Sequence, residues 1–226
     1  MHPKILALAV AASLLPAALT VAQSTIHSVP LPAATPPAAP QAPSAAALQW
    51  VQSNIAKWPE GTRRLAAQLI TKYGPPAEHS ARRLAWYDNA PWKRTTLYRE
   101  GPRHNFANTH QDILEQTVSY KVPPEKFTEL AQFNGSVIAD RTRGELTAIS
   151  DAEDTNFLAL NVAYDIIRGD RTVEQARTYF AQMVRAKMIG EPERALQALK
   201  FTPAKATDAA DPDELAPLIR HMNDSE

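Results

Sequence analysis

The chain has 226 residues and no cysteine, and its 24 basic side chains balance 24 acidic ones, so its formal net charge is zero with the six histidines neutral. The lack of cysteine excludes disulfide bonds and also the lipid attachment of a bacterial lipoprotein. The balanced charge argues against nucleic acid as the main partner, which would call for a strongly basic face.

The first 22 residues have the pattern of a secretory signal peptide. A single lysine precedes the apolar run 5–22, "ILALAVAASLLPAALTVA", and the small residues Thr20 and Ala22 fit the minus-three and minus-one positions of a cleavage site. An uncleaved membrane anchor is the alternative, but the run is barely long enough to span a bilayer and Pro16 interrupts it. We therefore expect export to the periplasm or the medium, a chain that begins at Gln23, and no membrane span after cleavage.

Three segments follow the signal peptide. Residues 23–47, "QSTIHSVPLPAATPPAAPQAPSAAA", are uncharged and rich in Pro and Ala, a composition typical of a disordered linker. Residues 48–201 have a globular composition and are numerous enough for a single domain with its own core. Residues 202–226 become polar and acidic again, which predicts a flexible polar tail with one short helix at 213–222.

The first half of the domain contains a predicted helix and a predicted hairpin. In "EGTRRLAAQLITKYGPP" apolar residues recur at helical spacing, Thr62 can cap the start, and Gly74 before two prolines ends the helix. In "RRLAWYDNAPWKRTTLYRE" aromatic and β-branched residues flank the turn "DNAP", which predicts two paired strands.

A short helix and a second hairpin come next. The stretch "KVPPEKFTELAQ" predicts a helix over residues 124–132, because its apolar residues share one helical face. The stretch "GSVIADRTRGELTAIS" predicts two strands around a loop in which Gly144 takes the positive-φ position.

Two longer helices close the domain. The stretch "SDAEDTNFLALNVAYDIIRG" begins with a predicted capping box of Ser150 and Glu153, and "RTVEQARTYFAQMVRAKMIG" begins with Thr172 and Gln175 in the same relation. A final helix is expected over residues 191–201.

The order of these elements predicts the fold class. Strand pairs lie among helices without a regular strand–helix alternation, which indicates an α+β fold. We expect a small antiparallel sheet built from the two hairpins, with an N-terminal helix and a C-terminal helical half. The sequence contains no glycine-rich phosphate loop, nucleophile elbow or zincin motif.

The stretch "RHNFANTHQDILEQ" concentrates residues that carry chemistry. It holds four candidate catalytic residues, His104, His110, Asp112 and Glu115, of which the first three are also candidate metal ligands. One histidine paired with Asp112 could act in acid–base catalysis.

The local structure of this stretch decides which side chains meet. A strand over residues 109–118 would put His110 and Asp112 on one face and turn Glu115 away, whereas a helix capped by Thr109 would make Asp112 and Glu115 neighbours. Neither arrangement collects all four residues. We favour the simpler account, a capped helix or strand start with a solvated carboxylate and loop histidines, because the spacing does not guarantee that metal ligands converge. We therefore expect no cofactor, and a His110–Asp112 pair that matters more to local structure than to metal binding.

Two further groups are candidates for ligand binding. Trp92 and Arg94 lie on the first hairpin and could form a platform for an anionic or aromatic-stacking ligand. We favour an ordinary half-buried hairpin with its cations in solvent, because alternation along the strands already accounts for most of these residues. Arg94 shares the parity of Trp92, so we expect it to be drawn inward to a carboxylate. Arg141 and Arg143 of "DRTRGE" could clamp a carboxylate or a phosphate, or could simply be solvated.

A series of motifs resembles a family of uncharacterised exported bacterial proteins: "KYGPP.E", "PWKRT..YR", "HNF", "H.D.LEQ", "Y.VPPEKF.EL", "GSV...RT.GE" and "N.LALN.A.DI..G". The resemblance covers about residues 58–179 and implies export and a single folded domain, but no activity. A helix ending in Gly-Pro before a Trp-bearing strand is also similar to the small outer-membrane assembly lipoproteins of the SmpA/OmlA type. This chain lacks their lipidated cysteine and adds a C-terminal helical half, so that likeness concerns the fold only.

These observations lead to two functional hypotheses. The first is a non-enzymatic binding or assembly accessory of the bacterial cell envelope, whose partner is an envelope protein or an anionic envelope component. The alternative is a hydrolase-like enzyme that depends on a metal or on His/Asp acid–base chemistry. No feature of the sequence fixes the oligomeric state.

Overall fold

The computed structural model describes residues 45–191 and 193–214. The predicted signal peptide, residues 23–44 of the predicted linker, and residues 215–222 of the predicted tail helix lie outside the described residues. Among the described helices, none combines the length and the apolar character needed to cross a bilayer.

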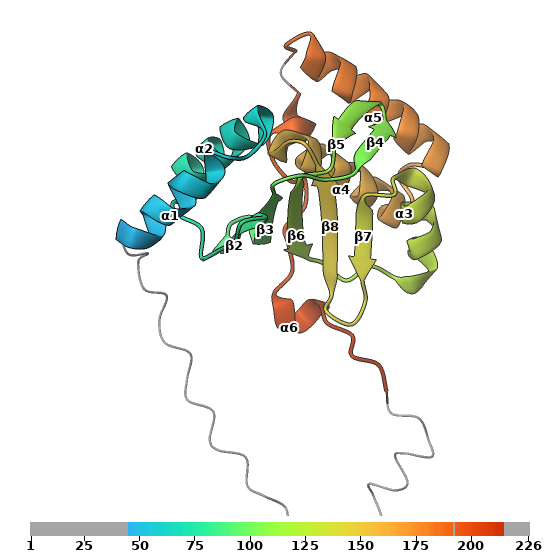
Figure 1. Ribbon diagram of the computed structural model, residues 1–226. Helices are drawn as coiled ribbons and strands as arrows, with labels where there is room; N and C mark the ends of the chain where they lie inside the picture. Colours follow the sequence, from blue (N-terminus) through green and yellow to red (C-terminus); the bar gives the residue numbers. More distant parts are fainter. Residues whose placement is uncertain (1–44, 192, 215–226) are drawn as a thin grey trace, which may run out of the picture. The chain divides into compact units, whose positions relative to one another are not determined.

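The described residues have the α+β fold that the sequence predicts (Figure 1). Six strands form one antiparallel sheet in the order β1-β2-β3-β6-β8-β7, and two more form a separate hairpin, β4–β5. The strands are β1 (Glu78–His79), β2 (Arg83–Asn89), β3 (Trp92–Tyr98), β4 (Arg103–Phe106), β5 (Asn108–Gln111), β6 (Leu114–Ser119), β7 (Val137–Asp140) and β8 (Glu145–Ser150). The helices are α1 (Ala45–Ile55), α2 (Glu60–Tyr73), α3 (Phe127–Phe133), α4 (Glu153–Arg168), α5 (Val173–Met188) and α6 (Ala206–Ala209), with 3-10 turns at Pro124–Lys126 and Arg194–Leu196.

Both predicted hairpins are present, as β2–β3 and β7–β8, and Gly144 has a φ of 60° in the second. The sequence left residues 109–118 open between a strand and a helix, and the structure forms β6 over part of this range, between β3 and β8, where it joins the two hairpins into one sheet. Its sequence, "LEQTVS", is a weak strand signal because its inward face includes the amide Gln116. Gln116 is tolerated there because its side chain hydrogen-bonds to Asn156 and Glu153 of α4.

The helix boundaries confirm one predicted cap and correct two. Thr172 and Gln175 form the predicted capping box of α5. Thr62 does not cap α2, which begins at Glu60, and its hydroxyl donates instead to the carbonyl of Arg99. The prediction of a capping box formed by Ser150 and Glu153 was wrong. The Glu153 carboxylate points into the interior, where four other side chains bind it.

Two further helix predictions differ from the structure. The final helix expected over residues 191–201 is absent from the described part of that range, where only a 3-10 turn forms. The Asn161 side chain explains this, because it donates to the carbonyls of Ala195 and Ala198 and accepts from the amide of Lys200, which holds the backbone in an irregular path. Helix α1 was not predicted, and it begins at Ala45 within the last residues assigned to the linker.

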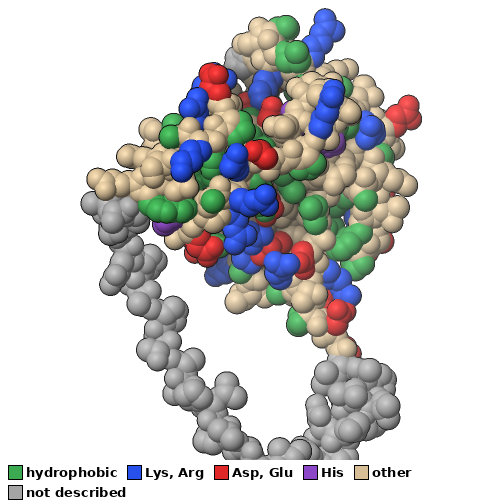
Figure 2. Space-filling model, in the orientation of Figure 1, with side chains coloured by type: hydrophobic (Ala, Val, Ile, Leu, Met, Phe, Trp, Pro, Cys, Tyr) green, Lys and Arg blue, Asp and Glu red, His purple; other side chains and the backbone are tan. Residues whose placement is uncertain are grey.

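The buried residues form two apolar clusters against the sheet. The larger joins the inward side chains of β6, β7 and β8 to α3, α4 and α5. The smaller joins α1 and α2 to β2, β3 and the start of β6. The other face of the sheet is turned toward the viewer in Figures 1 and 2, where basic and acidic side chains lie beside one another. Arg94 lies on this face, 3.6 Å from Glu115 and 3.3 Å from Glu145, so the expected pairing with a carboxylate is confirmed. The expected inward position on the side of Trp92 is wrong, because Trp92 is buried against Phe157 of α4 while Arg94 faces away from the apolar clusters.

Candidate functional site

The β4–β5 hairpin brings His104 and His110 together. Ala107, with a φ of 60°, forms the turn between the strands, and the register places His104 directly opposite His110. Directly opposed residues of antiparallel strands project from the same face. The two rings lie 5.1 Å apart between centroids. The spacing of the two histidines in "HNFANTH" therefore lets a tight hairpin bring them together. This hairpin was missed because residues 109–118 were treated as one helix or one strand.

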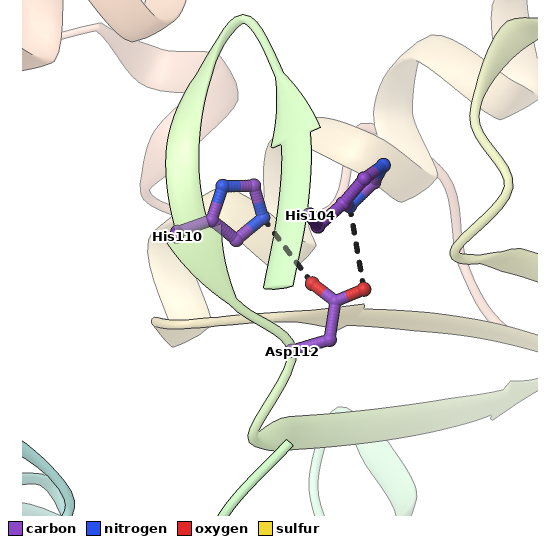
Figure 3. Close-up of side chains that lie close together, drawn as sticks. All are labelled: His104, His110 and Asp112. Carbon is purple, nitrogen blue, oxygen red and sulfur yellow. Dashed lines mark ion pairs between the residues drawn. The ribbon is translucent and has the colours of Figure 1, made fainter. Parts of the chain in front are cut away.

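Asp112 reaches the same point because the chain bends sharply between β5 and β6. Its amide donates to the carbonyl of Pro102, and the amide of Ile113 donates to the carbonyl of Ser150. Gly101 makes this approach possible, since a Cβ there would lie 1.9 Å from the carbonyl oxygen of Asp112. The bend places the Asp112 carboxylate beneath both imidazole rings (Figure 3).

The three side chains converge at ligand distance. His104 Nδ1 lies 3.3 Å from Asp112 Oδ2, and His110 Nε2 lies 3.2 Å from Asp112 Oδ1. One ligand atom from each residue lies within 4.8 Å of the other two. The His104 side chain is 21% exposed, that of His110 5% and that of Asp112 7%. The predicted closeness of His110 and Asp112 is confirmed, although Asp112 falls between two strands and not inside one.

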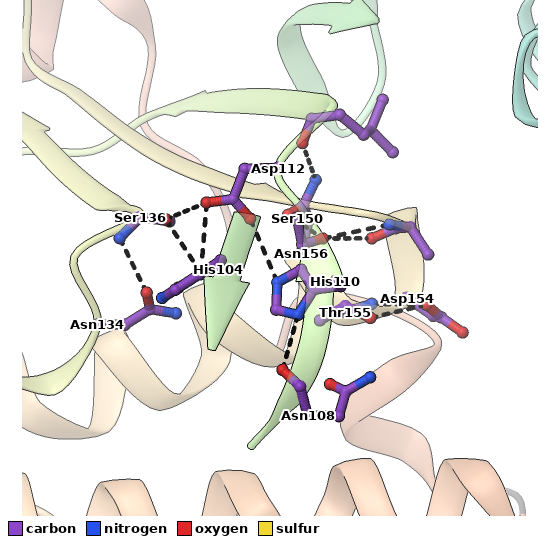
Figure 4. A network of polar contacts seen from close by, with 12 residues as sticks. His104, Asn108, His110, Asp112, Asn134, Ser136, Ser150, Asp154, Thr155 and Asn156 are labelled. Carbon is purple, nitrogen blue, oxygen red and sulfur yellow. Dashed lines mark hydrogen bonds and ion pairs between the residues drawn. The ribbon is translucent and has the colours of Figure 1, made fainter. Parts of the chain in front are cut away.

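Neighbouring polar groups orient these side chains (Figure 4). The Ser136 hydroxyl donates to Asp112 Oδ2 and lies 3.3 Å from His104 Nδ1. The amide of Ser136 donates to Asn134 Oδ1 at 2.8 Å. His110 Nδ1 lies 3.2 Å from the carbonyl oxygen of Asn108. The sequence offered no signal for Ser136, which is 24 residues from Asp112 and reaches it only through the fold.

The electrostatics of the His110–Asp112 contact call for a cation. A carbonyl can only accept, so His110 Nδ1 carries the proton that it donates to Asn108. In the neutral ring, Nε2 then carries no proton, so its lone pair faces the lone pairs of Asp112 Oδ1. Neither of these two buried atoms has a well-directed hydrogen-bond partner. Either a second proton on His110 or a metal ion resolves this contact between two acceptors.

The protein's own charges favour the proton when no metal competes. The neighbouring Asp112 carboxylate raises the pKa of His110, although burial of the ring acts in the opposite direction. Burial alone would raise the pKa of Asp112, but contacts with His110 and Ser136 outweigh it and lower that pKa. In the metal-free protein the two residues thus form an ion pair over the pH range in which His110 is protonated.

We expect the metal-free protein to gain stability from this pair at mildly acidic pH. Because the folded-state pKa of His110 is raised, the contribution is complete below the unfolded value of about 6.5 and is lost as the pH rises through the folded value, while Asp112 stays ionised. His110→Ala should cost on the order of 1 kcal/mol at about pH 5.5 and less at about pH 8.5, in urea unfolding with EDTA present. An equal cost at both pH values would contradict the ion pair.

The fourth candidate of this stretch, Glu115, lies outside the cluster. Its carboxylate accepts from the hydroxyl of Tyr98 at 2.9 Å and contacts Arg94 on the other face of the sheet. The structure therefore brings together three of the four predicted residues and separates Glu115 from them.

The candidate ligand-binding residues are engaged within the protein. Trp92 is buried against Phe157, so it offers no exposed ring face to a ligand. Arg94 binds two carboxylates, as described above. Arg141 pairs with Asp211 and Asp213, and Arg143 pairs with Asp140. None of the four presents a free platform or clamp among the described residues.

Sequence reasoning also missed a polar centre around Glu153. Its carboxylate accepts from Lys72 and Tyr73 of α2, from Trp92 Nε1 at 2.7 Å and from Gln116 Nε2 at 3.1 Å. Burial and this carboxylate together raise the pKa of Tyr73. Every side chain around Glu153 is used to hold α2, β3, β6 and α4 together, so the centre has the character of a structural link. An acidic residue at a helix start gives no sign of such a role in a sequence.

The histidine cluster does not have the geometry of a serine-hydrolase triad. In such a triad one ring nitrogen faces the serine and the other faces the aspartate. Here the same atom, His104 Nδ1, lies 3.3 Å from both Ser136 Oγ and Asp112 Oδ2, so His104 cannot pass a proton between them. Two of the larger hollows of the described surface are lined instead by residues of α2 and β2 and by residues of α5.

The arrangement of two imidazoles and one carboxylate therefore suits cation binding best.

Comparison of the chain with protein-family models, with curated proteins and with solved structures gives no match.

Proposed function

We propose that this chain is an exported bacterial envelope protein whose folded domain binds one divalent transition-metal ion of the zinc class through His104, His110 and Asp112. The observation that carries the proposal is the contact between His110 Nε2 and Asp112 Oδ1, two buried acceptors 3.2 Å apart with a third ligand atom beside them. Export rests on the leader sequence of residues 1–22.

The distances support an ion of this size. Zinc binds histidine nitrogen and carboxylate oxygen at about 2.0–2.1 Å, so the ligand atoms of a tetrahedral site lie roughly 3.3–3.4 Å apart. The distance between His110 Nε2 and Asp112 Oδ1, 3.2 Å, is close to that value, and His104 Nδ1 lies beside them, 3.3 Å from the other oxygen of the same carboxylate. Imidazole nitrogen suits Zn²⁺ and its transition-metal neighbours, whereas Ca²⁺ and Mg²⁺ prefer oxygen ligands throughout.

The ligand environment also has the second contact that metal-binding histidines require. A histidine that binds zinc usually donates its other ring N–H to a carbonyl or a carboxylate, which fixes the tautomer. His110 makes this contact with the carbonyl of Asn108. The ring thus presents Nε2 to the ion without any rearrangement.

Binding, not catalysis, is the role that we assign to the ion. Three protein ligands leave the fourth position of a tetrahedral zinc ion to a water molecule or to a substrate, so exposure of the site decides between the two. Here His110 and Asp112 are almost fully buried, and only His104 is partly exposed. The metal-dependent hydrolase that the sequence left as an alternative would require a substrate to reach the ion past two largely buried ligands, which favours water at the fourth position.

The test is zinc titration of the untagged mature protein after chelator treatment and dialysis. We expect one equivalent to bind in isothermal titration calorimetry, and His104→Ala and His110→Ala each to weaken binding by at least about 100-fold. Zinc at roughly 100 times its Kd should raise the stability of the wild type by about 2.7 kcal/mol.

His79→Ala is the matched control. His79 lies on β1, an edge strand of the main sheet, with its ring centroid 4.6 Å from that of Trp50, whereas both histidine ligands lie on the separate β4–β5 hairpin. It should bind zinc like the wild type. Failure of the wild type to bind, or equal binding by His110→Ala, would overturn the proposed function.

A further inference from the structure

Asp112 presents its two carboxylate oxygens to different partners. Oδ2 accepts from the Ser136 hydroxyl and lies 3.3 Å from His104 Nδ1. Oδ1 is buried, has no well-directed hydrogen-bond partner and faces His110 Nε2 at 3.2 Å. The carboxylate is therefore held with one oxygen occupied by the protein and the other free for an ion.

Ser136 is fixed by its surroundings and not by Asp112. It lies in the turn between α3 and β7, where its amide donates to Asn134 Oδ1 at 2.8 Å and its carbonyl accepts from the amide of Ile149 at 3.0 Å. Asn134 is itself buried, and its carbonyl accepts from the amide of Val137 at 3.0 Å. The backbone position of Ser136 is thus set by the turn between α3 and β7 and by its contact with β8, independently of the β4–β5 hairpin that carries the histidines.

We infer that Ser136 is a positioning residue that restricts Asp112 to a single metal-binding oxygen, Oδ1, and thereby selects small four-coordinate ions over larger ones. The inference rests on the proposed function. A carboxylate that binds through one oxygen keeps the coordination number low, which suits tetrahedral Zn²⁺. A carboxylate free to bind through both oxygens raises the coordination number, which suits ions of the Mn²⁺ class with more oxygen ligands.

Removal of the hydroxyl should change both affinity and geometry. Ser136→Ala frees Oδ2, so the carboxylate can rotate and bind through both oxygens. We expect the Kd for Zn²⁺ to rise by about 10- to 100-fold, the effect typical of losing a group that orients a metal ligand. The Kd for Mn²⁺ should change less or fall, so that the preference for Zn²⁺ over Mn²⁺ shrinks by about the same factor.

The experiment loads chelator-treated full-length mature protein with Co²⁺ as a spectroscopic substitute for zinc and compares three variants. The wild type should show the intense visible absorption of four-coordinate Co²⁺, and Ser136→Ala should show weaker bands of higher coordination. Ser136→Thr keeps the hydroxyl and should restore both the spectrum and the Zn²⁺ affinity. Thr109→Ala is the control, because the Thr109 hydroxyl lies in the same hairpin but donates to Asn105, away from Asp112.

The outcomes separate the two proposals. If the wild type binds neither Zn²⁺ nor Co²⁺, the proposed function fails. If the wild type binds both ions and Ser136→Ala has the same Zn²⁺ affinity and the same Co²⁺ spectrum, the positioning role of Ser136 is overturned while the metal site stands. A loss in Ser136→Ala that Ser136→Thr does not restore also overturns it, because the hydroxyl would then not be the cause.

Discussion

Glu153→Ala is expected to lower the free energy of unfolding by about 3 kcal/mol, because it leaves several buried donors without an acceptor. The Glu153 carboxylate accepts from the indole of Trp92 and from the amide of Gln116, and both of these residues are fully buried. Lys72, which also binds Glu153, is half-exposed and can return to water. The loss should be measured by urea denaturation near neutral pH.

Glu60→Ala is the matched control for this measurement. Glu60 also lies in the first turn of a helix, but its pair with Arg64 is exposed, so its loss should cost no more than about 0.5 kcal/mol. A cost below about 1 kcal/mol for Glu153→Ala would show that the centre does not hold the helices to the sheet.

Glu153→Gln removes the negative charge of the side chain but keeps its size and shape, so it isolates the contribution of the charge to stability. Burial alone would raise the pKa of Glu153, but the hydrogen bonds from Lys72, Tyr73, Trp92 and Gln116 outweigh it and lower that pKa. The charged form therefore contributes stability above the unfolded value of about 4.3, and this contribution is lost as the pH falls through the folded value. The stability difference between the wild type and Glu153→Gln should shrink accordingly in acid.

Phe106→Ala is expected to destabilise the protein by about 3–5 kcal/mol and to weaken zinc binding as well. Phe106 is the buried anchor of the β4–β5 hairpin, with its ring 5.7 Å from that of Phe133 and 4.8 Å from that of Phe180. The hairpin holds both histidine ligands, so a loosened hairpin must be ordered before the ion can bind. Urea unfolding and zinc calorimetry on the same sample measure the two effects.

Phe106→Leu provides the graded comparison. It keeps most of the apolar volume and should cost less than about 1.5 kcal/mol, with a correspondingly smaller change in zinc affinity. If Phe106→Ala lost stability but bound zinc as tightly as the wild type, the hairpin would be ordered without its anchor, and the coupling between the core and the site would be refuted.

Several elements could be predicted because short-range chemistry specifies them. The turn "DNAP" between aromatic and β-branched runs predicted β2–β3, and Thr172 with Gln175 predicted the start of α5. Gly144 predicted the turn of β7–β8. Each of these signals acts through residues within a few positions of one another, so no knowledge of the rest of the chain was needed.

Other features depend on partners far away in the sequence. Strand β6 carries the buried amide Gln116, which hydrogen bonds with Asn156 and Glu153 of α4 make favourable. The chain after α5 stays irregular because Asn161 binds its backbone. In both places the local sequence is ambiguous, and a polar side chain on another element decides the conformation.

The features of the candidate site also divide into those that the sequence indicates and those that depend on the fold. The sequence by itself determined which residues could form it, since His104, His110 and Asp112 stand out in a chain without cysteine. Only the tertiary structure decided that Glu115 points away and that Ser136 joins the other three. The physical reason is that metal ligands must converge within a few ångströms, and that convergence is set by strand register, by the close approach at Gly101 and by the packing of the α3–β7 turn.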